Sequence, residues 1–172
     1  RARRKNLNRP NHSPDCNNLM KFLLEISKKT DNMLMGTATP VQIHPIEAWD
    51  LLYILSQGSE NVLGNNYSEW QKNPVNGLKL IMGELKPEER EIFRYIKNPF
   101  PSSDEHKDFK IIRDKLNISD DESILNIEFF SDDRSLQRRI EGISNIETVK
   151  MYNPFIRKIV RRERRYLETQ IN

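Results

Sequence analysis

Residues 33–55 read Met-Leu-Met-Gly-Thr-Ala-Thr-Pro-Val-Gln-Ile-His-Pro-Ile-Glu-Ala-Trp-Asp-Leu-Leu-Tyr-Ile-Leu, and this stretch decides the expected fold. Its apolar start, residues 33–35 followed by Gly36, predicts a short buried strand that ends in a turn. In open α/β sheets, ligands bind beyond the carboxyl ends of the strands, so the hydroxyl groups of Thr37 and Thr39 are candidates for a binding site. Simple turn chemistry is the alternative, because Thr and Pro are common where strands end.

Helical spacing of apolar residues dominates the rest of the chain. Residues 18–29 follow an asparagine cap, and Pro45 with Glu47 in the first turn predicts a helix to about Ser56. No strand is expected after Gly58. Further helices are predicted at 66–73, 75–85, 87–97, 104–116, 132–141 and 155–168, while 117–130 is ambiguous. The predicted fold class is therefore mainly α, with one or a few short strands.

Composition limits the function classes. The 172 residues include one cysteine, which excludes a disulfide framework and a multi-cysteine zinc site. The three histidines are far apart, so surface or helix-capping roles are expected rather than metal ligation. The chain has no G-x-x-x-x-G-K-[ST] phosphate loop and no G-x-S-x-G nucleophile motif. No apolar run is long enough to cross a membrane, and the start does not resemble a signal peptide, so a cytoplasmic protein with no membrane partner is expected.

Charge is distributed unevenly along the chain. The net charge is +3, but residues 1–9 and 150–172 carry +5 each, which leaves −7 on the 140 residues between them. Basic ends of this kind are typical of nucleic-acid contacts, and they also occur as solvated faces.

The last predicted helix carries most of the second basic end. On a helical projection Phe155 and Ile159 share an apolar stripe with Ile156, Val160 and Leu167. The opposite face is cationic over Arg157, Lys158, Arg161, Arg162, Arg164 and Arg165. We expect this face to meet phosphates; pairing with the acidic body of the chain is the alternative.

Residues 33–55 resemble motif three of superfamily 2 helicases, most closely the Swi/Snf-type ATP-dependent helicases and DNA translocases. In that family a strand leads into a (Ser/Thr)-(Ala/Gly)-Thr-Pro turn, then a glutamine, then a helix with Glu, Trp and Leu-Leu. This chain has Thr37-Ala38-Thr39-Pro40 at the turn, followed by Gln42 and by Glu47, Trp49, Leu51 and Leu52. It departs at Ile43 and His44, where many relatives carry two asparagines, which fits a bacterial branch of the family.

Both ends of the chain add to the resemblance. Arg1-Ala2-Arg3-Arg4-Lys5-Asn6 is similar to the segment after the Asp-Glu-Ala-His box, which in the family holds Mg²⁺ and orients the attacking water. Residues 153–162 are similar to the segment that leads into the second RecA-like domain, although Glu163 stands where relatives usually carry a small polar residue. Residues 57–150 resemble nothing in the family.

The resemblance implies a piece of a larger helicase. Residues 1–57 are then the C-terminal end of the first RecA-like domain, 58–150 a helical insertion, and 151–172 a basic amphipathic helix leading to the second domain. Thr37, Ala38 and Thr39 couple ATP hydrolysis to movement on nucleic acid, and Arg1, Arg157, Lys158, Arg161, Arg162 and Arg165 contact nucleic acid.

The implied parent is a helicase and hydrolase that binds ATP and Mg²⁺, with double-stranded DNA or another nucleic acid and the rest of the helicase core as partners. The phosphate loop and metal-binding acids are missing from this piece, so we expect it to bind no cofactor and to be inactive alone. The alternative is a non-enzymatic helical module that binds nucleic acid or an acidic protein through its basic ends. Residues 33–42 discriminate between the two, because a pure helical bundle has no use for a strand followed by Thr-Ala-Thr-Pro.

Overall fold

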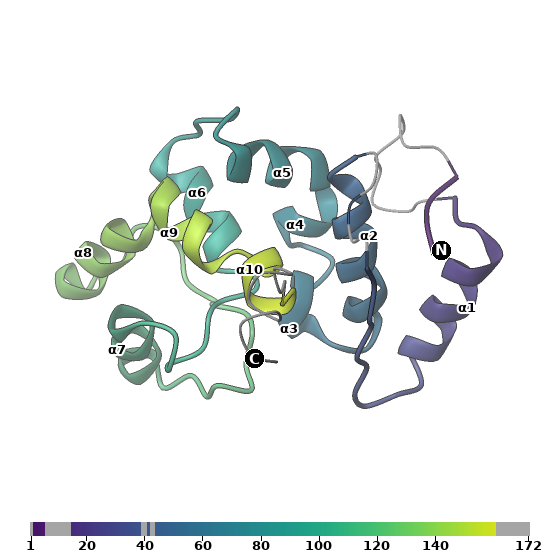
Figure 1. The fold of residues 1–172 in the computed structure, drawn as a ribbon. Coiled ribbons are helices and arrows are strands. Elements are labelled where there is room, and N and C mark those ends of the chain that lie inside the picture. Colours follow the sequence, from purple (N-terminus) through teal and green to yellow (C-terminus); the bar gives the residue numbers. More distant parts are fainter. Residues whose placement is uncertain (1, 6–14, 39–40, 42–43, 161–172) are drawn as a thin grey trace, which may run out of the picture.

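A computed structural model describes residues 2–5, 15–38, 41 and 44–160, and the structural statements below concern these residues. They form a mainly helical structure without a sheet, which confirms the predicted fold class (Figure 1). Within the described ranges the recorded β-pairing is one isolated antiparallel bridge between Arg4 and Cys16. No described helix is long and apolar enough to cross a membrane.

The first two helices agree with the sequence patterns. Helix α1 (Asn18–Ser27) begins after Asn17, whose side chain accepts a hydrogen bond from the Met20 N–H group at 3.0 Å. Helix α2 (Ile46–Leu55) follows Pro45 and has Glu47 in its first turn. A 3₁₀ turn, η1 (Ser56–Gly58), continues directly from α2.

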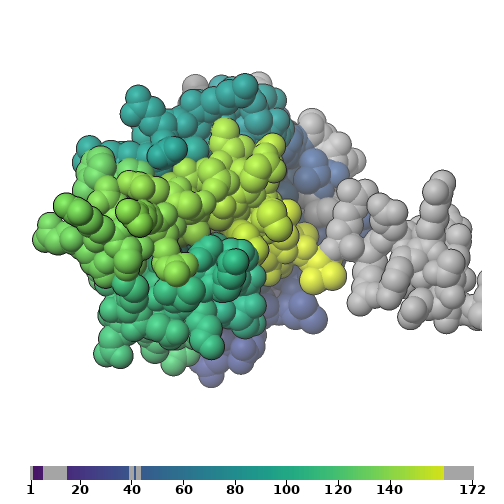
Figure 2. Space-filling model, turned by 90° about the vertical axis from the view of Figure 1, so that its left-hand side faces the viewer, coloured from purple at the N-terminus to yellow at the C-terminus, as the bar shows by residue number. Residues whose placement is uncertain are grey.

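The remaining helices surround a common core. They are α3 (Glu60–Leu63), α4 (Glu69–Lys72), α5 (Pro74–Met82), α6 (Glu89–Ile96), α7 (Lys107–Leu116), α8 (Arg134–Ile143), α9 (Ile146–Tyr152) and α10 (Pro154–Lys158). Helices α3 and α9 were not predicted, because each is too short for a clear apolar periodicity, although Ser59 and Asn145 cap their first turns. The ambiguous residues 117–130 contain no helix. Figure 2 shows α8, α9 and α10 (green to yellow) beside α7 on one face of the molecule.

Two tryptophans lie at the centre of the main core. The Trp49 indole N–H donates to the Trp70 carbonyl oxygen at 2.7 Å, and the Trp70 indole N–H donates to the Tyr95 carbonyl oxygen at 2.8 Å. These bonds satisfy both buried N–H groups and join α2, α4 and α6. The core therefore continues across the predicted division at residues 57 and 58.

A second, smaller apolar cluster lies between α1 and α2. It consists of Cys16, Met20 and Ile54, with partly buried side chains packed around it. Helix α2 thus contributes Ile54 to this cluster and Trp49 to the main core. Figure 1 shows α1 at the edge of the molecule, next to α2.

The buried strand predicted at residues 33–35 is not formed. The segment is extended, but it has no strand pairing within the described chain, and Leu34 is 99% exposed. Met33 and Met35 pack against the second cluster, so only alternate side chains are covered. A parallel strand needs neighbours for its backbone groups and cover on both faces, and the described residues supply neither.

The helix predicted at 155–168 is shorter than expected. Helix α10 ends at Lys158, and Ile159 has an extended backbone (φ −116°, ψ 112°). Ile156 and Val160 are 62% and 86% exposed, so the predicted apolar stripe is wrong at these two positions. β-Branched residues favour extended backbone where packing does not hold a helix. Residues 161–168 lie outside the described part of the chain.

Candidate functional site

The predicted coupling turn lies at the end of the extended segment. Residues 33–38 run between α1 and α2 (Figure 1), and both Thr37 and Ala38 are exposed. Thr39 lies outside the described residues. The structure thus places two of the three predicted coupling residues at the surface, ahead of α2.

A histidine fixes the start of the helix that follows the turn. His44 Nδ1 accepts a hydrogen bond from the Ile46 N–H group at 3.1 Å, and the Glu47 carboxylate accepts one from the His44 N–H group at 3.4 Å. This reciprocal pattern satisfies two N–H groups at the helix start. His106 caps α7 in the same way, through the Asp108 N–H group at 3.2 Å. Both histidines are therefore caps, and no metal-binding group of side chains occurs among the described residues.

A buried ion pair joins the opening segment to α2. Arg4 Nε donates to both Asp50 carboxylate oxygens at 3.0 Å, and Nη2 donates to Oδ1 at 2.6 Å. The two side chains are 1% and 2% exposed, and the guanidinium lies 5.4 Å from the centre of the Trp49 ring. Burial raises the pKa of Asp50, and the bonds from Arg4 oppose this rise.

This pair was not predicted, although the sequence contains a signal for it. Asp50 is a carboxylate in the middle of α2, which apart from Glu47 in its first turn is otherwise apolar. A carboxylate on a buried helix requires a cationic partner. The basic run at the start of the chain offered several partners, so the pattern indicates that a partner exists without identifying Arg4.

The structure gives Arg157, a predicted nucleic-acid contact, a partner within the protein. Its Nε donates to the Glu105 carboxylate oxygens at 2.9 and 2.7 Å, and its Nη2 lies 2.6 Å from Oε1. The two side chains are 11% and 22% exposed, and Arg157 Nη1 is buried without a hydrogen-bond partner. Desolvation acts to raise the pKa of Glu105, but bonds from Arg157 and Ser102 outweigh it and lower the pKa.

The other predicted phosphate contacts divide into two groups. Lys158 is exposed at the end of α10, and desolvation of its ammonium group together with the adjacent Arg157 lowers its pKa. Arg1, Arg161, Arg162 and Arg165 lie outside the described residues, so their roles stay predictions.

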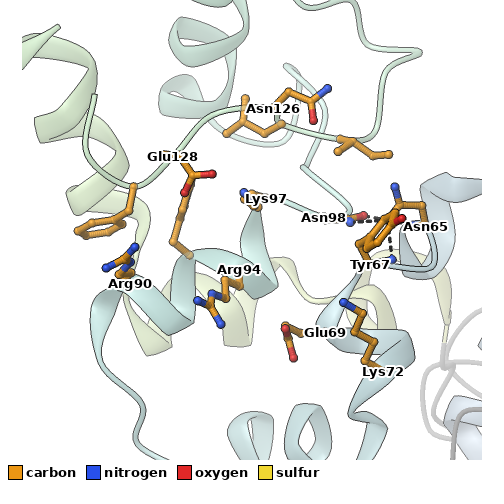
Figure 3. A pocket seen from close by; sticks show the side chains of 14 residues that line it. Asn65, Tyr67, Glu69, Lys72, Arg90, Arg94, Lys97, Asn98, Asn126 and Glu128 are labelled. Carbon is orange, nitrogen blue, oxygen red and sulfur yellow. Dashed lines mark hydrogen bonds between the residues drawn. The ribbon is translucent and has the colours of Figure 1, made fainter. Parts of the chain in front are cut away.

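A pocket that the sequence analysis did not identify lies beside α4 and α6. It has a volume of about 460 Å³ and is bordered by residues 65–72, by α6 and by the irregular segment 124–129 (Figure 3). Arg90, Arg94 and Lys97 line it from α6. Their spacing of four and three residues places them on one helix face, and this was the available sequence signal.

Comparison of the chain with protein-family models, with curated proteins and with solved structures finds no match. The candidate site is therefore defined by two local features. One is the extended segment that ends at the exposed residues Thr37 and Ala38, ahead of α2. The other is the cationic pocket on α6.

Proposed function

We propose that this chain is part of an ATP-dependent nucleic-acid helicase or translocase of the Swi/Snf type. In this proposal the turn at Thr37–Thr39 couples the nucleotide site to bound nucleic acid. ATP and Mg²⁺ bind elsewhere in the helicase core, and this chain contributes the coupling turn and the helix that follows it.

The observation that carries the proposal is the half-covered extended segment before the turn. Met33 and Met35 face the cluster between α1 and α2, whereas Leu34 is 99% exposed. An extended segment with unpaired backbone groups is a template for pairing with another strand, and a parallel strand within a sheet is covered on both faces. A neighbouring strand of a RecA-like sheet supplies both the pairing and the cover that this segment lacks among the described residues.

The Arg4–Asp50 pair gives further support. The resemblance places the metal-binding acids directly ahead of Arg1, while Asp50 lies on the helix behind the turn. A bidentate pair with distances of 2.6–3.0 Å fixes these two parts of the chain relative to each other. A fixed relation between the metal site and the turn is what coupling requires, because loss of the γ-phosphate must change the contacts of the turn.

Two measurements test the proposal. The coding sequence ahead of Arg1 should encode Asp-Glu-Ala-His, and its absence there would overturn the family assignment. The purified 172-residue chain should show no steady ATP hydrolysis, because phosphoryl transfer needs several positioned groups that it lacks. Steady turnover that survives removal of contaminants contradicts this expectation.

In the complete helicase, Thr37→Ala combined with Thr39→Ala should preserve nucleotide binding and reduce nucleic-acid-stimulated ATP hydrolysis. Thr30→Ala, an exposed threonine at the end of α1, is the matched control and should behave as wild type. Equal loss of nucleotide binding and turnover would indicate a folding defect at the turn and would remove the coupling role. A nucleic-acid affinity that is the same with and without ATP would favour a non-enzymatic binding module instead.

A further inference from the structure

We infer that the cationic pocket beside α6 binds single-stranded nucleic acid, with a base stacked on Tyr67 and the backbone phosphates next to Arg94 and Lys97. The pocket lies within residues 58–150, which carry no resemblance to the helicase family. The inference therefore stands independently of the proposed function.

Tyr67 is an exposed ring on a fixed backbone. It is 76% exposed, and its N–H group donates to Asn65 Oδ1 at 2.9 Å. The next residue, Ser68, is fully buried; its hydroxyl donates to the Asn98 carbonyl oxygen at 2.8 Å and accepts from the Trp70 N–H group at 3.1 Å. The backbone is thus anchored on both sides while the ring stays outside the core. A pre-positioned aromatic ring is the element on which unpaired bases stack.

Cations lie within reach of that ring. Lys72 Nζ is 5.1 Å from the centre of the Tyr67 ring. Arg94 is exposed, and no ion pair with a described acid is recorded for it. Lys97 Nζ donates one hydrogen bond, to the Ile127 carbonyl oxygen at 3.2 Å, and an ammonium group has three N–H bonds. A phosphate beside a stacked base can therefore meet several donors at once.

The charge balance of the pocket favours an anion. Two carboxylates, Glu69 and Glu128, line it together with four cations, the three on α6 and Lys72, which leaves a net charge of +2. Glu69 Oε2 already accepts a hydrogen bond from Asn73 Nδ2 at 2.7 Å. Figure 3 shows these side chains around the hollow, with Tyr67 and Lys72 at one end and Arg90 at the other.

A second exposed ring indicates that the ligand is a nucleic-acid single strand rather than one nucleotide. Phe130 is 64% exposed, and its ring centre lies 5.9 Å from Arg90 Cζ. Figure 3 shows Arg90 at the end of the pocket away from Tyr67. Cations between two exposed rings suit a chain of nucleotides, with bases at the rings and phosphates between them. Duplex nucleic acid hides its bases from such rings, so preference for a single strand is expected.

The experiment measures binding of the full chain to a fluorescein-labelled 12-nucleotide oligo-dT and to a 12-base-pair duplex, by fluorescence anisotropy at several salt concentrations. Tyr67→Ala should weaken oligo-dT binding at least about fivefold, and Tyr67→Phe should restore it, because stacking needs only the ring. Phe22→Ala removes a comparably exposed ring on α1 and should have no effect. Arg94→Gln should reduce the slope of log affinity against log salt by about 0.7, whereas Lys110→Gln on α7 should leave it unchanged.

Photocrosslinking distinguishes oligonucleotide binding at the pocket from binding at the basic ends of the chain. An oligonucleotide carrying 5-iodouracil should crosslink to Tyr67 or Phe130, as located by mass spectrometry. Crosslinks confined to other residues, or equal binding by wild type and Tyr67→Ala, would overturn the inference. Displacement of oligo-dT by polyglutamate, with no effect of Tyr67→Ala, would identify an acidic-peptide site and would overturn it as well. These results are independent of the test of the coupling turn, which measures ATP hydrolysis by the Thr37→Ala and Thr39→Ala double variant.

Discussion

Replacing Arg4 with alanine tests whether the opening segment is a structural part of the fold. The variant leaves the Asp50 carboxylate, 2% exposed, without its guanidinium partner. Removing one partner of a buried pair costs about 3–5 kcal/mol, because an uncompensated charge stays buried. Against a typical stability of about 5–15 kcal/mol, this is about a fifth of the total or more. We expect urea denaturation, followed by circular dichroism at 222 nm, to show a loss of this size.

Two controls separate the buried charge from other effects. Lys5→Ala removes the neighbouring pair with Asp15, whose atoms are 3.4 Å apart and whose side chains are 55% and 69% exposed, and it should cost less than about 1 kcal/mol. Arg4→Met combined with Asp50→Leu removes both charges and should recover most of the loss. Equal losses for Arg4→Ala and Lys5→Ala would refute the reasoning. A double variant as unstable as Arg4→Ala would show that packing, not charge, causes the loss.

Three further predictions concern stability. The pKa of Glu105 lies below its ordinary value of 4.5, although burial acts to raise it. The ionised carboxylate therefore stabilises the fold above pH 4.5, and this contribution is lost as the pH falls through the lowered pKa. Glu105→Gln should reduce this loss of stability at acid pH in denaturation curves measured between about pH 3 and 7. Gly77→Ala places a Cβ atom 2.9 Å from the Trp70 ring and should cost about 1–3 kcal/mol. Gly142→Ala, in α8 with nothing within 4 Å, should stabilise by up to about 1 kcal/mol, and thermal unfolding of both alanine variants should show shifts of opposite sign.

Local signals predicted the helices well. The asparagine before α1 and the proline and acid at α2 determine where these helices begin, and both signals act within a few residues. The same holds for the start of α5 at Pro74. Its end was predicted too late, at residue 85, because Gly83 adopts a left-handed backbone (φ 78°) and ends the helix after Met82. Such signals require no knowledge of the tertiary structure.

Features that depend on distant contacts were predicted less well. The strand expected at residues 33–35 needs pairing partners, and an apolar run does not reveal whether they are present. The end of α10 depends on whether other parts of the protein pack against Ile156 and Val160. Both side chains are exposed, and a helical projection does not reveal this. The Arg4–Asp50 pair spans 46 positions and the Arg157–Glu105 pair 52, so no spacing rule connects them.

The cluster between α1 and α2 provides a natural reporter of partial opening. Cys16, the single cysteine of the chain, is 4% exposed there, and burial raises its pKa. A thiol reagent can modify it only when this cluster opens, and the cluster involves far fewer side chains than the core around the tryptophans. The rate of thiol labelling in native buffer therefore measures how often this cluster opens while the rest of the molecule remains folded. No mutation has to be introduced for that measurement, because the cysteine is native to the chain.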